Sequence, residues 1–393
     1  MKRRLRSELS LLVAGAAAAL GCSSSEPRQA DYKGVAYPND RPSFDRRAGR
    51  IGYVANRNDD TVSVLDLDAM KLLGTVPVGR DPVDIDGPRH VVLDTENDLA
   101  YIALSYPFSE QSPHALIEGG TQRAGYVEAL DLDDLSVMGD LRVDPSANEL
   151  AFSPSLSALA VSHYDVFRAL SSENDDRRAN LVLVDPARDI ALDDATARRS
   201  PLCAVPAAMA FSADGSRLFV ACTGDDALVV VDPRTEKVLS SVKAGEFQVN
   251  KPYALVADSA RGRVLLSNQV TKAVSVFDMS DEPAMLASLP VLGPPMFPVW
   301  LSDSTIAVPF QQPSGVSLFD LSTNQELLQA LFPIEDCENA AELSLTSDGR
   351  LLLVCEGTHY QPGSVVELDP ATLEIRAKVA VGVYPERMAI SEP

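Results

Sequence analysis

The sequence of 393 residues lacks the short motifs that mark the commonest enzyme sites. It contains no HExxH pair, no GxSxG elbow, no Walker A loop and no GxGxxG fingerprint. "CEGTH" at residues 355–359 does not have the C-x-x-C-H spacing of a c-type haem site. The single tryptophan, Trp300, lies in a strand pattern, where core packing is its expected role. No stretch of the chain therefore identifies a reaction or a cofactor, and we expect the protein to have no cofactor.

Basic charge and helical periodicity are also scarce. The chain has 34 Lys and Arg against 56 Asp and Glu, a net charge of −22. A surface this acidic repels nucleic acid and offers no obvious basic cleft for phosphorylated substrates. From about residue 50 to the end, short β-rich runs follow one another without a second linker. One all-β domain over residues 50–393 is the simplest prediction.

The N-terminus has the layout of an export signal. A basic segment is followed by an apolar stretch and then by "ALGC", which ends at Cys22. The apolar stretch is too short to span a bilayer, and "ALGC" resembles the lipobox in which the cysteine is lipidated after cleavage. We expect residues 1–21 to be a lipoprotein signal peptide, and residues 22–49 to be the lipidated cysteine and a flexible tether. Ser23 favours the outer membrane, with the domain in the periplasm or at the cell surface; the alternative is an ordinary exported protein.

A hydrophobic strand that ends in aspartate recurs seven times. The seven aspartates are Asp66, Asp131, Asp185, Asp232, Asp278, Asp320 and Asp369. Repeats of about 40 to 50 residues built from short strands are typical of propeller blades with four strands. Because this aspartate opens each turn that follows, we interpret it as a turn residue and not as a catalytic one.

The chain resembles YVTN-type seven-bladed propellers. The resemblance is carried by two of the repeats, "YVANRNDDTVSVLD" and "FVACTGDDALVVVD", and by the glycine that follows a strand in "TVPVG" and "VAVG". The resemblance covers residues 50–393 and implies a closed ring of antiparallel blades. Members include surface-layer and envelope proteins, and lactonases and amine-dehydrogenase subunits are structural relatives. The Arg, Glu and His of the lactonase-type pocket cannot be matched residue by residue.

The carboxylates of "NRNDD" raise the question of a cation site. The corresponding turn of another repeat is "NQVTKA", which places Thr271 and Lys272 where the aspartates stand. A metal site shared by the repeats would not accept lysine, whereas Asn and Asp are the residues that tight turns prefer. We therefore predict a structural role for this motif.

Long connections occur on only one face of the predicted disc. Within each blade the connections between strands A and B, and between C and D, are minimal, whereas residues 107–125 and 165–178 are insertions on the opposite face. Long loops on a rigid scaffold are where function usually lies. The predicted binding face is defined by Tyr106, Phe108, His114, Arg123, His163, Tyr164, Phe167, Arg168 and His359. The alternative is that the two insertions only pack on each other.

The four histidines, His90, His114, His163 and His359, all map to this face. If the four side chains converge over the channel mouth, they could bind copper or zinc, and we regard them as weak candidates for metal ligands. Solvated loop side chains are the simpler interpretation.

Four cysteines of the domain have a symmetric placement. Cys203 and Cys337 precede the innermost strands of two blades, while Cys222 and Cys355 end the second strands of the same blades. Since antiparallel pairing puts these positions side by side, we predict the disulfides Cys203–Cys222 and Cys337–Cys355. The first blade lacks its own innermost strand, so we also predict that residues 388–391 pair with residues 51–55 and close the ring.

These observations favour an envelope lipoprotein that is held at the membrane by its N-terminal lipid. Its propeller would bind an envelope protein or another ligand without catalysis. The alternatives are a periplasmic enzyme, either a lactonase-like hydrolase or an oxidoreductase linked to a metal or a quinone, and a structural envelope module without a dedicated ligand.

Overall fold

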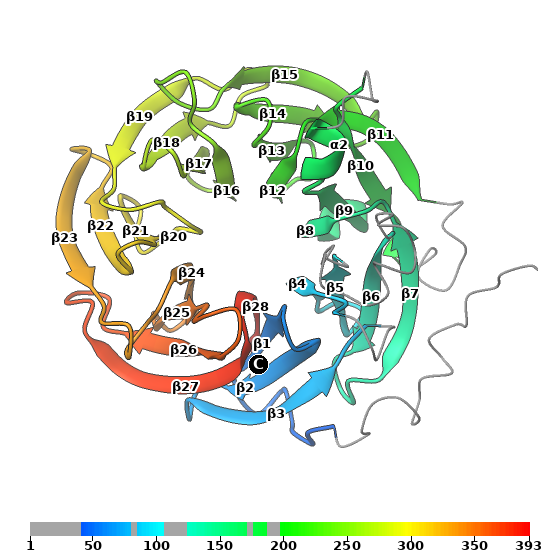
Figure 1. Ribbon diagram of the computed structural model, residues 1–393, viewed down its shortest axis with the longest axis vertical. Coiled ribbons are helices and arrows are strands. Elements are labelled where there is room, and N and C mark those ends of the chain that lie inside the picture. Colours follow the sequence, from blue (N-terminus) through cyan, green and yellow to red (C-terminus); the bar gives the residue numbers. More distant parts are fainter. Residues whose placement is uncertain (1–40, 80–84, 106–123, 171–175, 187–196) are drawn as a thin grey trace, which may run out of the picture.

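In the computed structural model the chain forms seven four-stranded antiparallel sheets arranged around a central axis (Figure 1). The structure describes residues 41–79, 85–105, 124–170, 176–186 and 197–393. Tyr106, Phe108, His114 and Arg123 lie outside these residues. The sequence-based prediction of a seven-bladed propeller is confirmed.

Each blade is one sheet, whose four strands follow one another from the central axis to the outer wall. Blade 1 contains β28 (Pro385–Ser391), β1 (Ile51–Asn56), β2 (Thr61–Asp66) and β3 (Lys71–Pro77). Blade 2 contains β4 (Pro88–Asp94), β5 (Leu99–Leu104), β6 (Gly125–Asp131) and β7 (Val137–Val143). Blade 3 contains β8 (Ala147–Ser153), β9 (Ala158–His163), β10 (Ala179–Val184) and β11 (Arg198–Cys203). Blade 4 contains β12 (Pro206–Phe211), β13 (Leu218–Cys222), β14 (Ala227–Asp232) and β15 (Lys237–Lys243).

The remaining three blades follow the same order. Blade 5 contains β16 (Pro252–Asp258), β17 (Arg263–Asn268), β18 (Ala273–Asp278) and β19 (Met285–Pro290). Blade 6 contains β20 (Val299–Trp300), β21 (Thr305–Phe310), β22 (Gly315–Asp320) and β23 (Gln325–Leu331). Blade 7 contains β24 (Ala340–Leu345), β25 (Leu351–Cys355), β26 (Pro362–Leu368) and β27 (Ile375–Val383). Two short helices, η2 (Pro154–Leu156) and α2 (Val166–Leu170), lie in connections of blade 3.

The C-terminal strand closes the ring as predicted. β28 pairs with β1, with Met388 opposite Val54 and Ser391 opposite Ile51. Both predicted disulfides are also present: the sulfur atoms are 2.03 Å apart in Cys203–Cys222, and Cys337 is bonded to Cys355. No helix in the described part of the chain is long and apolar enough to cross a membrane.

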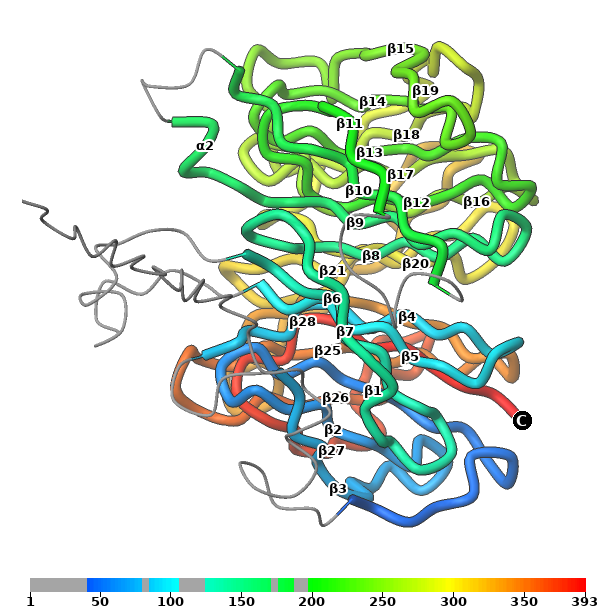
Figure 2. Tube along the Cα trace, turned by 90° about the vertical axis from the view of Figure 1, so that its right-hand side faces the viewer, coloured from blue at the N-terminus to red at the C-terminus, as the bar shows by residue number. Residues whose placement is uncertain are grey.

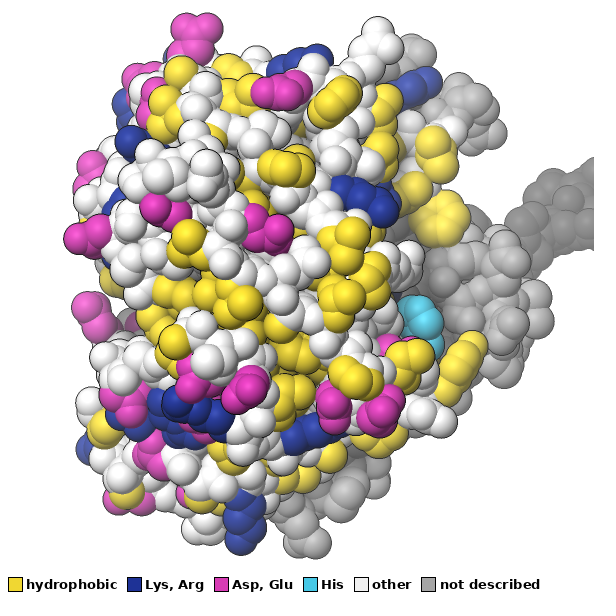
Figure 3. All heavy atoms as spheres, turned by 90° about the vertical axis from the view of Figure 1, so that its left-hand side faces the viewer, with side chains coloured by type: hydrophobic (Ala, Val, Ile, Leu, Met, Phe, Trp, Pro, Cys, Tyr) yellow, Lys and Arg dark blue, Asp and Glu magenta, His cyan; other side chains and the backbone are white. Residues whose placement is uncertain are grey.

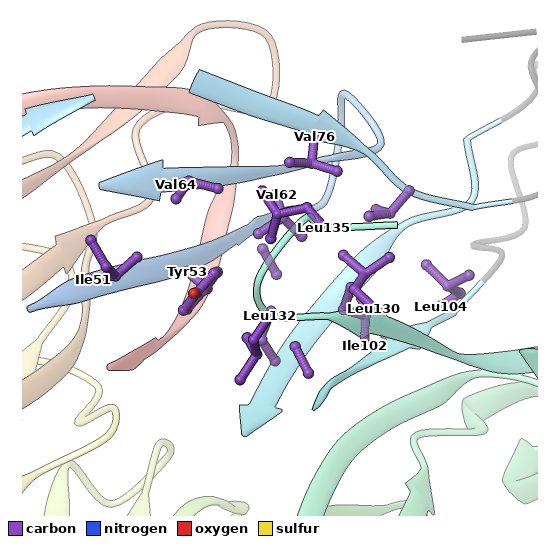
Figure 4. Packing of buried hydrophobic residues seen from close by; sticks show 14 of the residues in the cluster. Ile51, Tyr53, Val62, Val64, Val76, Ile102, Leu104, Leu130, Leu132 and Leu135 are labelled. Carbon is purple, nitrogen blue, oxygen red and sulfur yellow. The ribbon is translucent and has the colours of Figure 1, made fainter. Parts of the chain in front are cut away.

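The hydrophobic core lies between neighbouring blades, because the middle strands of each sheet bury both faces. Figure 4 shows one such interface, in which Tyr53 and Val62 of blade 1 face Ile102 and Leu130 of blade 2. Because both faces of these strands are buried, apolar residues occupy successive positions instead of alternating with polar ones. The strands are therefore near-continuous hydrophobic runs. The outermost strands instead expose one face, as at Met285 and Leu327, and Figure 3 shows hydrophobic side chains along this wall of the disc.

The paired aspartates of the "NDD" and "GDD" turns connect blades. Asp59 accepts the N–H of Val383, at the end of β27, and Asp60 accepts the N–H groups of Asp86 and Gly87, before β4. Asp225 and Asp226 make the corresponding bonds in blade 4. The described residues contain no group of three or more His, Cys, Asp or Glu that could hold a metal ion. The bonds support the structural role that we predicted for these turns.

Candidate functional site

The innermost strands all begin at one face of the disc, which we call the loop face. Figure 2 shows α2 on this face and the C-terminus on the opposite one. The residue before each of six inner strands has a positive φ: Gly87 66°, Ser146 60°, Val205 52°, Lys251 58°, Asn339 56° and Tyr384 56°. The pairing with the next strand then shifts register at the strand start. Such bulges redirect side chains, and here they are at the channel mouth.

Every blade except the fourth contributes to a polar cluster at this mouth. We call it the channel-mouth cluster, and its members are Arg89, His90, Glu149, Tyr253, Phe297, Glu342, Glu356, Glu386 and Arg387. Most of them are the second or third residue of an inner strand. Eight residues, five of them Arg or Glu, line a pocket at this mouth. Its empty volume is about 230 Å³ when the open mouth is included, and the enclosed part holds about one water molecule.

Arg387 is the centre of one half of the cluster. Its Nη1 lies 2.9 Å from Glu149 Oε1, and its Nε lies 2.9 Å from Glu342 Oε1. Its guanidinium carbon is 3.6 Å from the centre of the Phe297 ring. The Nδ1 atom of His90 lies 3.0 Å from Glu149 Oε2. One cation is thus shared by two buried carboxylates.

Glu386 is the centre of the other half. Its carboxylate accepts Arg89 Nε at 2.8 Å and Arg57 Nη1 at 3.0 Å. Arg89 Nη2 also donates to the hydroxyl of Tyr253 at 3.3 Å. Burial raises the pKa of Tyr253, so its hydroxyl stays protonated at neutral pH.

Glu356, directly after β25, differs from Glu149, Glu342 and Glu386. Among the described residues, those three carboxylates form ion pairs with arginines, whereas Glu356 forms none. Gln311 donates to its Oε2 at 3.0 Å, and the residue is only 6% exposed. Burial raises the pKa of Glu356 to about 8, and the negative charge of Glu386 adds to the effect. Burial also raises the pKa of Glu342, whereas at Glu149 Arg387 and His90 outweigh burial and lower the pKa. Glu356 can therefore hold or release a proton near neutral pH.

The predicted site residues are only partly brought together. His90 belongs to the channel-mouth cluster, and Tyr164 reaches it through an edge-to-face contact with Tyr253, with ring centres 5.9 Å apart. His163 is buried, with Nδ1 2.9 Å from the carbonyl oxygen of Asn180, and His359 stacks on Tyr384. The described histidines therefore do not converge on a common centre.

The two other described residues of the predicted face lie on α2. Phe167 is 59% exposed, and Arg168 donates from Nε to the carbonyl oxygen of Arg178 at 2.7 Å. Trp300 is buried in the core, as expected, with the guanidinium of Arg261 over its ring.

The arginines and glutamates of the cluster were not predicted, although the sequence carries a signal for them. When the starts of the inner strands are aligned, "GPRHV", "SANEL", "KPYAL", "NAAEL" and "YPERM" place charged or aromatic residues at equivalent positions. In an otherwise apolar strand, such residues at one end point to a shared polar site.

Comparisons with known proteins bear on the fold. Among solved structures, the periplasmic gluconolactonase PpgL of Pseudomonas aeruginosa has a TM-score of 0.63 at 12% identity, covering 87% of this chain and 99% of that one. A 6-phosphogluconolactonase homologue from Bacteroides fragilis has a TM-score of 0.59 at 13% identity, with coverages of 87% and 98%. The dihydro-heme d1 dehydrogenase NirN, solved in complex with DHE, has a TM-score of 0.58 at 17% identity, with coverages of 89% and 77%. No family model matches the sequence, and no curated protein matches it.

These similarities establish the propeller fold and nothing finer. At such low identity the activities of the similar proteins do not transfer to this chain. The channel-mouth cluster has to be judged on its own chemistry.

Proposed function

We propose that the protein is a hydrolase of small hydroxylated cyclic esters, of which sugar lactones are the type, and that it acts at the channel mouth. The observation that carries the proposal is Glu356, a buried carboxyl group with a pKa of about 8 in a pocket that also contains Arg89, Tyr253 and Arg387. A group that can exchange a proton near pH 7 is suited to general acid–base catalysis. The fold similarity to proteins named as lactonases supports the same reaction class.

In this mechanism the ionised carboxylate of Glu356 takes a proton from a water molecule as its oxygen attacks the ester carbonyl carbon. The guanidinium of Arg89 stabilises the negative charge on the carbonyl oxygen. The ring C–O bond then breaks, and the proton on Glu356 passes to the leaving alkoxide oxygen. The product is the open hydroxy acid. Because the enclosed space holds about one water, the substrate lies over the pocket mouth, where its hydroxyl groups meet carboxylate acceptors.

Hydrolysis of δ-gluconolactone by the purified protein tests the proposal. We expect catalysis above the spontaneous rate, with kcat/KM rising with pH through about 8, since the base must be ionised. Glu356→Gln removes the base and lowers kcat by roughly 10²-fold or more. Glu335→Gln, an exposed carboxylate on the same face, is the matched control and leaves kcat unchanged. Catalysis by the Glu356→Gln variant at the rate of the parent protein would refute the role of Glu356.

Non-catalytic binding of an envelope protein by the loop face is the second candidate. The observation that favours it is the exposure of large apolar side chains there, with Leu170 of α2 79% and Tyr360 90% exposed. Replacement of residues 108–122 and 167–177 by short Gly-Ser turns leaves every described strand intact. We expect the propeller to remain folded and to lose its crosslinked partners in intact cells. The same partners at the same yield would exclude these loops as the interface.

The location of the protein is part of the proposal. We infer that the chain is lipidated at Cys22, that the residues before Arg41 tether the propeller, and that the anchor lies in the outer membrane. The support is the sequence of the N-terminus alone. Residues 41–49, which we predicted to belong to the tether, instead pack on the propeller: Phe44 lies against the core of blades 1 and 2, and the buried Arg46 pairs with Asp98 and Asp133.

A further inference from the structure

A group of apolar side chains is exposed where blades 4, 5 and 6 meet on the loop face. Phe247 and Val249 are each 61% exposed, Val270 is 55% exposed and Leu292 is 46% exposed. They come from the connections before β16, after β17 and after β19. The described short turns on the opposite face expose no large hydrophobic side chain. The exposed apolar groups of the connections are thus confined to one face of the disc.

Hydrogen bonds fix these connections to one another. Asn250 is buried, and its Nδ2 donates to the carbonyl oxygen of Phe247 at 2.8 Å and to Asp226 at 2.7 Å. The N–H of Val270 donates to the carbonyl oxygen of Asn250 at 3.0 Å. Val291, beside Leu292, donates to the carbonyl oxygen of Lys272 at 2.7 Å. The backbone is therefore held in place and directs the apolar side chains outward.

The charge around these side chains is opposite to that of the whole molecule. Lys243, Lys251 and Lys272 are exposed among them, with Glu246 the one acidic residue in the same connections. The nearby carboxylate of Asp226 already accepts the N–H groups of residues 250 and 251. The ammonium groups of Lys243 and Lys272 lie 3.2 and 3.5 Å from the carbonyl oxygens of Glu246 and Leu292. Counted against the carboxylates of Glu246 and Asp226, the three lysines leave a net charge of +1 here, in a chain whose net charge is −22.

We propose that this lysine–apolar patch, formed by the four apolar residues and three lysines above, docks on the surface of an anionic lipid bilayer. The apolar side chains enter the boundary between headgroups and acyl chains, and the ammonium groups meet lipid phosphates. Lysine favours a membrane over a protein partner, because protein interfaces are depleted in Lys and enriched in Arg, and these connections contain no Arg. Long lysine stems also cover apolar surface while keeping the charge in the headgroup layer.

Docking in this way would turn the loop face, and with it the channel mouth, towards the membrane. The inference does not depend on the proposed hydrolysis, nor on a lipid at Cys22. An exposed isoleucine on the same face, Ile334, provides a contrast. It is 73% exposed but has Glu335, Asp336 and Glu338 beside it, so an anionic surface would repel it.

The test is co-sedimentation with vesicles of phosphatidylethanolamine and phosphatidylglycerol, using the chain from residue 23 onward. This chain has neither the signal segment nor Cys22, and it retains all seven sheets and the closing strand. We expect binding that weakens as salt is raised, and no binding to pure phosphatidylcholine vesicles. Phe247→Ser with Val249→Ser should weaken binding at least tenfold, and each of Lys243→Gln, Lys251→Gln and Lys272→Gln roughly fivefold.

Ile334→Ser is the matched control and should bind as the parent chain does. All substituted side chains are exposed, and a circular dichroism spectrum identical to that of the parent verifies folding. Equal binding by the parent and the Phe247→Ser, Val249→Ser variant would overturn the proposal. So would failure to bind anionic vesicles together with salt-dependent capture on immobilised polyglutamate, which would assign the patch to an acidic protein partner instead.

Discussion

Arg387 is the residue on which the electrostatics of the channel mouth depend most. It is the shared cation of Glu149 and Glu342, two residues that are each 6% exposed. A buried carboxylate that loses its partner retains its desolvation penalty, whereas an exposed ion pair contributes little in either direction.

Arg387→Met should therefore destabilise the fold. The methionine keeps part of the contact with Phe297 but leaves both carboxylates without their cation, and we expect the free energy of unfolding at pH 7 to fall by about 3–5 kcal/mol. Urea unfolding followed by circular dichroism measures the change. Arg376→Met is the control, because Arg376 is exposed and its pair with Asp369 is screened by solvent, and it should change the stability much less. Equal losses in the two variants would mean that the buried network does not stabilise the fold.

Single residues also mark where prediction from the sequence ends. All four histidines could be assigned to one face from the repeat, but the sequence does not reveal that the ring of His163 bonds the backbone of Asn180. Arg387 and Glu149 are 238 positions apart, and although both lie near the start of an inner strand, nothing in the sequence indicates that they pair with each other. Their pairing also depends on the register shifts at the starts of their strands, β28 and β8, which no local pattern encodes.

At the scale of strands and turns, prediction was most successful where a feature recurs in every blade. The aspartate at the end of the third strand was assigned to a turn, and Asp66, Asp232 and Asp369 indeed accept backbone N–H groups two or three residues further on. The disulfides were predictable for a related reason, since cysteines precede the inner strand and end the second strand of both blade 4 and blade 7.

The inner strands show why the candidate site was harder to predict. Their first residues are displaced by bulges, so the alternation of side chains along the rest of the strand does not tell which way those residues point. The channel-mouth cluster lies on the same face of the disc as the described residues of the predicted binding face. The cluster itself, however, lies on the rigid strands beneath the loops, as the preorganisation of a polar site requires.

The whole molecule is a ring that depends on its last strand. β28 completes blade 1, packs beside β4 of blade 2 and carries Glu386 and Arg387 into the channel mouth. Figure 1 shows this strand from the C-terminus next to β1 from the N-terminal part of the propeller. Stability and the candidate site are therefore linked by one segment at the end of the chain.

Deletion of residues 385–393 should abolish the native fold. Without β28 the edge of β1 is unpaired, Met388 no longer packs against the core of blades 7 and 1, and Glu149 and Glu342 lose Arg387. The combined loss is comparable to the total stability of a domain, about 5–15 kcal/mol. We expect the cooperative thermal transition to disappear and the protein to associate through its open edge. Deletion of residues 392–393 alone, which lie beyond β28, is the control and should leave the transition nearly unchanged; a transition retained in the longer deletion would show that the ring is stable without its closing strand.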